Sequence, residues 1–243
     1  MLNEKVKEFL SNYKYKIELH AHTNPCSGCS RMSVSEVVTR LKESGYSAVV
    51  LTNHYFYDHG AYRETPDPIA TYLKDYNEAK ALGDKLGIKV FLAMEIRFLG
   101  SMNDYLVLGV DEQFLRDIYN RSELTVDSFY EEFHNPDRLI IQAHPFRNNG
   151  TPANLNSLDG LEIMNMHPDQ KSRSAMAAKF ANENNVPIVT IGTDLHHNEH
   201  VGICSLRTKT LPTTEKELVA LLRKGDYIFD IGGYPMLPQF KLD

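Results

Sequence analysis

The chain has 243 residues, of which 42% are hydrophobic and 24% charged, and its formal net charge is −6. This composition predicts a globular protein with a sizeable buried core, and the acidic balance argues against stable nucleic-acid binding, although a nucleotide could still be a substrate. No apolar run approaches the ~18 residues of a membrane span, and the charged N-terminus lacks a signal-peptide core, so we expect a cytoplasmic protein with no membrane partner.

Secondary-structure patterns alternate between strand and helix along the chain. In order, we expect a helix over 2–13, a strand over 15–22, a helix from the capping box at 33–36 to Gly45, a strand over 47–52, a helix over 69–86, strands over 89–94 and 104–109, helices within 111–134, strands over 139–143 and 160–165, a helix over 168–185, a strand over 186–191, a helix capped by Thr214, and a strand over 227–231.

The strands over 89–94 and 104–109 are joined by a turn too short for a parallel crossover, so we expect them to pair antiparallel. That pairing returns Asp104 to the neighbourhood of Glu95. The other strands are apolar runs joined through helices, which predicts a parallel sheet, either doubly wound or closed into a barrel. Because no dinucleotide or P-loop glycine fingerprint follows the first strand, the sequence favours an α/β barrel made irregular by the hairpin.

Histidine and carboxylate residues gather at the carboxyl ends of five predicted strands. They are His20, His22, His54, Glu95, His144, Asp194 and His196. In a barrel these ends meet at one mouth, and imidazole and carboxylate groups together are ligands of zinc, manganese or iron. The set exceeds the three or four protein ligands of one catalytic ion, so we expect two or three ions with Glu95 as a bridge. For any single member the alternative is a hydrogen bond to a backbone carbonyl or, for Asp194, a helix cap.

The remaining polar residues of interest are placed less distinctively. Asn165 also follows a predicted strand, and we interpret it as a loop or supporting residue rather than a ligand. We expect most of the other histidines to be ordinary surface or loop residues: His59, His134, His167, His197 and His200. The three cysteines predict no disulfide framework, and although Cys26 and Cys29 have a Cys-x-x-Cys spacing that allows a redox or zinc site, there is no second pair.

Five short motifs occur in an order that is specific as a set. They are Glu18–Thr23, Leu51–His54, Ala93–Ile96, Ala143–Pro145 and Gly192–His196. Together they resemble the motifs of the PHP family, named for polymerase and histidinol phosphatase, and Leu161–Asn165 is similar to a further strand of that family. The resemblance spans roughly residues 15–200. It implies an α/β fold, a distorted (β/α)7 TIM-like barrel formed by one domain over residues 1–243, with two or three divalent ions and phosphoester hydrolysis.

Matching positions in the family imply how the ligands would be divided. The resemblance implies that one ion is bound by His20, His22, Glu95 and Asp194. It implies that a second ion is bound by Glu95 and His144, and a third by His54 and His196.

The chain departs from the family pattern at three places near these positions. Asn53 stands where the family usually has an aspartate, which would remove a charge beside the third ion. The loop after the first two histidines has no acid or histidine, so Cys26 or Cys29 is the candidate thiolate ligand there. Asp104 stands where the family often has a histidine, and the hairpin independently places it near Glu95.

Clustered divalent ions lower the pKa of bound water, which predicts hydrolysis of a phosphomonoester or phosphodiester of a small molecule or nucleotide by a metal-bound hydroxide. Arg97 and Arg147 lie on predicted rim loops, where a guanidinium could hold phosphate oxygens in a bidentate fork, the alternative for each being a surface arginine. Two other functions stay open: an amidohydrolase-like hydrolase of a C–N bond, and a non-catalytic metal-binding domain.

Overall fold

The computed structural model describes residues 4–56 and 61–238. Residues 2 and 3 of the predicted opening helix, and His59, therefore lie outside the described part. The helices are α1 (Glu4–Asn12), α2 (Val34–Glu43), α3 (Pro68–Leu86), α4 (Glu112–Ile118), α5 (Val126–Phe133), α6 (Ser174–Glu183) and α7 (Glu215–Lys224). The strands are β1 (Tyr15–Ala21), β2 (Ala48–Leu51), β3 (His54–Phe56), β4 (Lys89–Arg97), β5 (Tyr105–Leu108), β6 (Leu139–Gln142), β7 (Gly160–Asn165), β8 (Ile188–Gly192), β9 (Cys204–Thr208), β10 (Tyr227–Ile231) and β11 (Tyr234–Met236).

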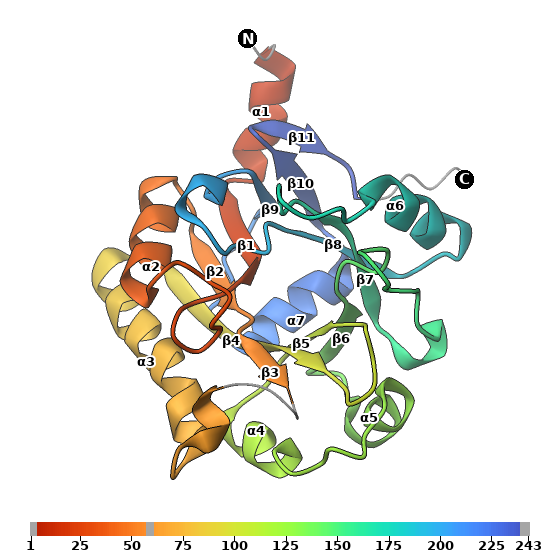
Figure 1. The fold of residues 1–243 in the computed structure, drawn as a ribbon. Helices are drawn as coiled ribbons and strands as arrows, with labels where there is room; N and C mark the ends of the chain where they lie inside the picture. Colours follow the sequence, from red (N-terminus) through yellow and green to blue (C-terminus); the bar gives the residue numbers. More distant parts are fainter. Residues whose placement is uncertain (1–3, 57–60, 239–243) are drawn as a thin grey trace.

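A mixed sheet runs in the order β11-β10-β9-β1-β2-β4-β5-β6-β7-β8, and β3 pairs with β4 beside this path. The pairs β1–β2, β2–β4, β6–β7 and β7–β8 are parallel. The sheet curls until the chain after β8 returns to β1 (Figure 1), where the Leu195 N–H donates to the His20 carbonyl at 2.9 Å and the His22 N–H to the Leu195 carbonyl at 3.0 Å. The architecture is therefore mixed α/β, with the sheet curled into a half-barrel.

The hairpin of β4 and β5 sets the irregular part of this sheet. The two strands pair antiparallel with Glu95 opposite Leu106, which confirms the predicted hairpin. β5 also pairs antiparallel with β6, and the Ala143 N–H donates to the carbonyl of Asp104 at 2.9 Å. Asp104 thus lies between the carboxyl ends of β4 and β6, as the short turn requires.

The segment 111–134 forms helices as expected, and Thr125 begins the second of them, α5, with a capping box. Other elements differ from the sequence prediction for local reasons. α6 starts at Ser174 rather than near 168, since Arg173 has a φ of 50°, in the left-handed region that a right-handed helix cannot pass through. The sequence does not predict β3, β9 or β11, which are only three to five residues long.

Helices α2 to α6 lie around the outside of the curled sheet, and one end of the sheet is left open (Figure 1). α2 begins at the predicted capping box, where Glu36 accepts the Ser33 N–H at 2.8 Å and Ser33 accepts the Glu36 N–H at 3.3 Å. α7 covers the opposite end, because its Leu218 and Leu222 are buried and its Arg223 donates to the Pro136 carbonyl just before β6. Within the described residues, no helix combines the length and apolar character needed to cross a membrane.

Candidate metal centre

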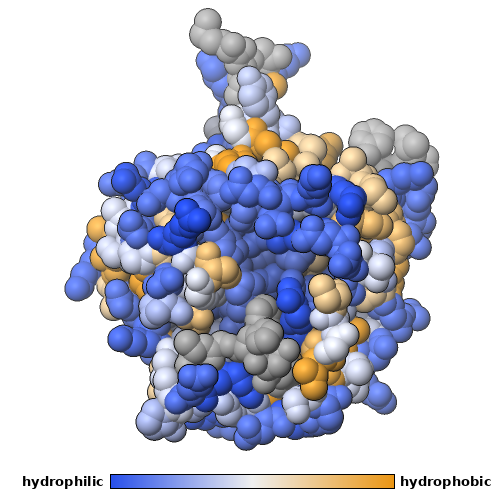
Figure 2. Space-filling view, viewed as in Figure 1, coloured by the Kyte–Doolittle hydropathy of each residue, from blue (hydrophilic) through white to orange (hydrophobic). Residues whose placement is uncertain are grey.

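A pocket of about 450 Å³ lies at the open end, where the carboxyl ends of the parallel strands meet. The face onto which it opens is hollowed and hydrophilic (Figure 2). The pocket is lined by Cys29, Arg31, His54, Glu95, Arg97, Asp104, His144, Arg147, Asn148, His167, Asp169, Gln170, Asp194, His196 and His197. The curl of the sheet therefore brings together strand-end residues that are up to about 140 positions apart in the sequence.

His20 and His22 lie fully buried beside this pocket at the end of β1. The Nε2 atoms of both rings face the same two carboxylates: His20 Nε2 lies 3.5 Å from Glu95 and 3.4 Å from Asp194, and His22 Nε2 lies 3.4 Å and 3.2 Å from them. Neither Nε2 atom makes a hydrogen bond with any described residue. Buried polar atoms normally have a partner, so two orphan ring nitrogens aimed at carboxylates fit a cation bound between them.

The other ring nitrogen of His20 is fixed by a residue that the sequence reasoning did not single out. His20 Nδ1 lies 2.8 Å from Glu162 on β7, and the second oxygen of Glu162 accepts the His144 N–H at 3.0 Å. Gly192 makes this contact possible, because a Cβ there would lie 2.5 Å from the His20 Cβ and 2.6 Å from Glu162 Oε1. A carboxylate that holds Nδ1 directs Nε2 toward a metal, which is the usual arrangement around ligating histidines.

Glu18 is a second supporting carboxylate beneath the site. It accepts the backbone N–H groups of His20 and Thr193 at 3.0 and 2.9 Å and the Thr193 hydroxyl at 2.6 Å. Burial raises the pKa of Glu18 to about 7, against the opposing effect of these hydrogen bonds. Glu18 thereby fastens the end of β1 to the end of β8. Both Glu18 and Glu162 lie inside the motifs that resemble the PHP family, and this position in the sequence could have identified them.

Glu95 occupies the middle of the cluster. Its carboxylate lies 2.8 Å from His54 Nδ1 and 3.1 Å from His144 Nε2, in addition to its approach to His20. Glu95, Asp104 and His144 offer ligand atoms within 4.8 Å of one another. Glu95, the predicted bridging residue, thus lies between the side chains of His54 and His144, and Asp104 lies in the same set.

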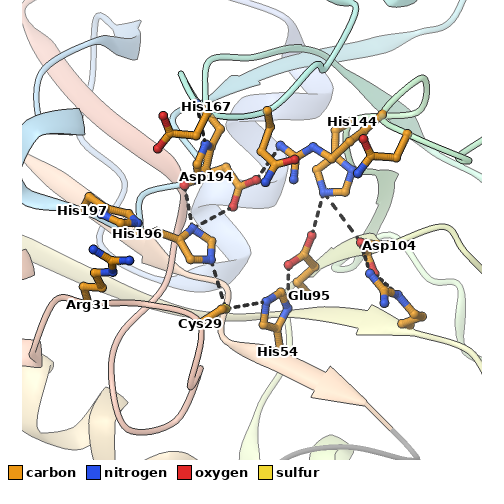
Figure 3. A pocket seen from close by; sticks show the side chains of 15 residues that line it. Cys29, Arg31, His54, Glu95, Asp104, His144, His167, Asp194, His196 and His197 are labelled. Atoms are coloured by element: carbon orange, nitrogen blue, oxygen red, sulfur yellow. Dashed lines mark hydrogen bonds and ion pairs between the residues drawn. The ribbon is translucent and has the colours of Figure 1, made fainter.

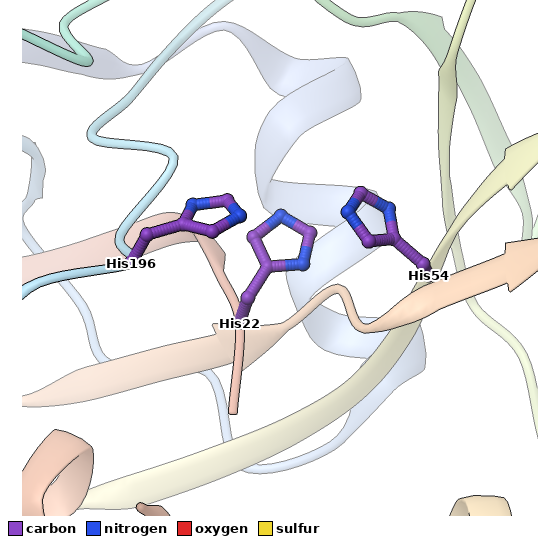
Figure 4. Close-up of side chains that lie close together, drawn as sticks. All are labelled: His22, His54 and His196. Atoms are coloured by element: carbon purple, nitrogen blue, oxygen red, sulfur yellow. The ribbon is translucent and has the colours of Figure 1, made fainter. Parts of the chain in front are cut away.

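A third set of side chains lies on the other side of Glu95. Ligand nitrogens of His22, His54 and His196 lie within 4.8 Å of one another (Figure 4). The Cys29 sulfur lies 3.1 Å from His196 Nε2 and 3.2 Å from His54 Nε2 (Figure 3). Cys26 is not brought to this set, since its sulfur lies 3.7 Å from the Tyr72 carbonyl in the core.

Burial disfavours charge on His54, His196 and Cys29, but the effect of their neighbours on the pKa outweighs that of burial. Burial lowers the pKa of His54, and Glu95 raises it to about 10, while Asp194 in the same way raises the pKa of His196 to about 10. Burial raises the pKa of the Cys29 thiol, but hydrogen bonds with His196 and His54 bring it down to about 6. A divalent cation can take the place of the ring protons in such a set of alternating acids and imidazoles.

The family model of the PHP domain matches residues 18–183 of the chain. The chain belongs to the PHP domain family. No curated protein sequence matches the chain.

Solved structures with the same fold are distant in sequence. A two-domain protein from Bacteroides vulgatus, which contains a predicted PHP-like metal-dependent phosphoesterase, superposes with a TM-score of 0.63 at 14% identity, covering 89% of this chain and 64% of that one. PsfC from Pseudomonas syringae has a TM-score of 0.61 at 14% identity, with 86% and 90% covered. The lesion-specific endonuclease PfuEndoQ from Pyrococcus furiosus has a TM-score of 0.58 at 14% identity, with 86% and 56% covered. The PHP chain thus spans less than two thirds of the first and third of these proteins, and the likeness establishes the fold.

The two predicted phosphate-binding arginines line the pocket of this PHP protein and are both engaged by acids. Arg97 donates two hydrogen bonds to Asp104, at 2.6 and 2.7 Å. Arg147 lies 2.7 Å from Asp194 and donates to the side-chain oxygen of Asn165. Asn165 itself donates to Glu162 and Asp194 at 2.9 and 3.2 Å, consistent with a supporting residue.

Two histidines expected to be ordinary surface or loop residues also line the pocket. His167 is buried and His197 half-buried, and both lie on its rim beside His196 (Figure 3). Burial lowers the pKa of His167 to about 4. Their positions in the sequence could have identified them, since His167 follows Asn165 by two residues and His197 follows His196 directly. His134 instead pairs with Asp159 at 3.1 Å.

Asn53 ties the loop that follows β1 to the start of β3. Its Oδ1 accepts the Thr23 N–H at 2.8 Å and the Ser27 hydroxyl at 2.9 Å, and its Nδ2 donates to the Thr23 hydroxyl at 2.8 Å. Ser27 in turn accepts the His54 N–H at 2.9 Å. An aspartate at this position could not donate to Thr23, so the departure from the family pattern has a local structural role.

Proposed function

We propose that this PHP protein is a metal-dependent phosphoesterase that hydrolyses a phosphomonoester or phosphodiester of a small molecule or nucleotide. The observation that carries the proposal is that three ligand sets lie around Glu95, with Arg97 and Arg147 on the wall of the same pocket. Two of the sets contain Glu95, and the third reaches it through His54, whose Nδ1 lies 2.8 Å from the carboxylate. We further propose that the curled sheet corresponds to a distorted (β/α)7 barrel and that residues 1–243 act as one domain.

The proposed centre holds two or three divalent ions of zinc, manganese or iron. One ion would be held by Glu95 together with His20, His22 and Asp194. A second ion would be held by Glu95 together with His144 and Asp104. A third ion would be held by His54 and His196, and His22 is close enough to contribute to it. Bound ions of this kind lower the pKa of a coordinated water and neutralise charge on phosphate oxygens.

The chain's own residues would prepare this chemistry. Glu162 keeps the Nδ1 proton on His20 so that Nε2 is available as a ligand. Arg147 is anchored on Asp194 and Asn165 through one terminal nitrogen, so the N–H groups of its other terminal nitrogen can donate to a phosphate in the pocket. Arg97 uses two of its N–H groups to bind Asp104, so its main role would be to orient that carboxylate.

The names of two structural neighbours, a phosphoesterase and an endonuclease, denote cleavage of phosphoester bonds and support the same class of reaction. The chain covers 64% and 56% of these two proteins, at 14% identity to each. The specific substrate therefore has to come from assay rather than from similarity.

The test is a hydrolysis screen with purified protein reconstituted with manganese or zinc. The panel contains histidinol phosphate, other phosphomonoesters, nucleotides and short oligonucleotides, together with amide substrates. Turnover of a phosphoester supports the proposal. Hydrolysis of C–N bonds alone would replace it with an amidohydrolase-like activity, and bound metal without any turnover would indicate a non-catalytic domain. Less than about half an equivalent of metal after reconstitution would contradict the metal centre itself.

Arg147→Ala gives the sharper form of this test. Loss of hydrogen bonds to a charged phosphate costs about 1.5–3 kcal/mol, so kcat/KM should fall roughly 10- to 100-fold with metal content unchanged. Arg121→Ala is the matched control, because its guanidinium pairs with Glu123 and Glu132 on the surface and does not line the pocket. Equal activity in both variants would exclude a phosphate-binding role for Arg147.

A further inference from the structure

Cys29 presents its sulfur to two rings that come from different parts of the sheet. His54 opens β3, His196 follows β8, and the Cys29 sulfur lies 3.2 and 3.1 Å from their Nε2 atoms (Figure 3). The residue is exposed as a whole, at the edge of the pocket. A small surface loop thus delivers a soft donor to the rim of the cluster.

The grouping of His22, His54 and His196 beside this sulfur is a second observation that points to a bound cation. The His22 ring lies between those of His54 and His196, with ring centroids 4.4 Å from each (Figure 4). His22 Nε2 is fully buried and makes no hydrogen bond with a described residue. Even without the sulfur, the ligand nitrogens of the three histidines lie close enough together to share an ion.

The distances fit a thiolate ligand. A tetrahedral zinc with Zn–S near 2.3 Å and Zn–N near 2.0 Å sets sulfur and nitrogen roughly 3.5 Å apart. The observed sulfur–nitrogen distances of 3.1 and 3.2 Å are a few tenths of an ångström shorter. The sulfur and the two rings would therefore need to separate only slightly to admit an ion.

The loop that carries Cys29 is fastened to the same elements as the histidines. The Ser27 hydroxyl donates to Asn53 at 2.9 Å, next to His54. The Ser30 hydroxyl donates to the His22 carbonyl at 3.1 Å, and the Arg31 N–H donates to the His196 carbonyl at 2.9 Å. Each of the three histidines is thus joined to the loop by a hydrogen bond to itself or to its neighbour, which holds the sulfur in place before any ion binds.

We propose that the Cys29 thiolate is a metal ligand together with His54 and His196, and that it makes this end of the centre selective for zinc over manganese. This inference rests on the proposed function only in assuming that the centre binds ions. Thiolate and imidazole donors favour zinc, whereas the opposite end offers the carboxylates of Glu95 and Asp104 with one imidazole, a set that suits manganese or iron. The two ends of one centre therefore differ in the metal they prefer.

The test compares cobalt-substituted wild-type protein with Cys29→Ser and Cys26→Ser. A thiolate ligand gives Co²⁺ a sulfur-to-metal charge-transfer band in the near ultraviolet, which oxygen and nitrogen ligands do not give. Wild type and Cys26→Ser should show the band, because the Cys26 sulfur lies in the core against Tyr72. Cys29→Ser should lose it, and its zinc affinity, measured by chelator competition, should fall at least tenfold with manganese binding unchanged.

Cys29→Asp tests the selectivity separately. A carboxylate at this position should restore binding of an ion without the charge-transfer band and shift the preference of that site toward manganese. The band in Cys29→Ser, its absence in wild type, or unchanged zinc affinity in Cys29→Ser would overturn the inference. Phosphoester turnover is measured in parallel: active protein without the band refutes the thiolate alone, whereas the band without turnover refutes the proposed function alone.

Discussion

Glu162→Gln is the most informative single substitution in the chain, because three buried donors share the two oxygens of this carboxylate. One oxygen lies 2.8 Å from His20 Nδ1, and the other accepts the His144 N–H at 3.0 Å and the Asn165 side-chain N–H at 2.9 Å. Glutamine has the same shape but only one accepting oxygen. Its amide nitrogen must therefore face at least one donor in a site that is 1% exposed.

The expected magnitude follows from that count. A buried donor left without an acceptor costs about 1–3 kcal/mol, so the metal-free protein should lose about that much unfolding free energy. If the amide nitrogen faces His20, the ring loses the group that fixes Nδ1 as the protonated nitrogen. Loss of such a contact lowers metal affinity by about 10- to 100-fold.

Two measurements separate these effects. Urea unfolding of metal-free protein gives the stability term, and competition with a chelating dye gives the affinity for zinc and manganese. Glu43→Gln is the matched control, since Glu43 is an exposed glutamate paired only with Arg40 on α2 and should change neither quantity. A folded Glu162→Gln protein whose metal affinity stays within twofold of wild type would refute the role given to Glu162.

The remaining predictions concern the scaffold of the site. Gly192→Ala would place a Cβ 2.5 Å from the His20 Cβ, so it should cost about 1–3 kcal/mol in urea unfolding and weaken metal binding, and wild-type values for both would contradict the close approach. Ser33→Ala removes the cap of α2 and should cost about 1 kcal/mol in the same assay with metal affinity unchanged, while Ser33→Thr should keep most of the stability; an equal loss in both would argue against the cap.

Local signals predicted the fold where pairing is local. The β4–β5 hairpin followed from the length of its turn, and the start of α2 followed from Ser33 and Glu36. β9 was missed because it has five residues, Cys204–Thr208, and obtains its place by antiparallel pairing with β1 and β10. Such pairing depends on where distant strands lie, and the sequence of a short strand carries little of that information.

For the candidate site, residues at the predicted carboxyl ends of strands were found, whereas Glu18 and Glu162, which lie earlier in their strands, were not. His20 and His144 attracted attention because strand ends converge on one mouth. Glu162 lies within β7, where a polar residue reads as ordinary alternation, and its contact with His20 joins β1 to β7 across the curled sheet. Only the curvature of the sheet makes that contact, so periodicity along the chain could not reveal it.

The choice between Cys26 and Cys29 shows why two departures from the family pattern belong together. The sequence alone does not distinguish the two thiols. In the structure the Cys26 N–H donates to the buried Asp75, and the Cys26 side chain is turned into the core. Asn53 fixes the next turn of the loop through Thr23 and Ser27, and an aspartate could not make all of these contacts. The residue that removes a charge from the site is thus the one that helps to hold the loop with Cys29 at its rim.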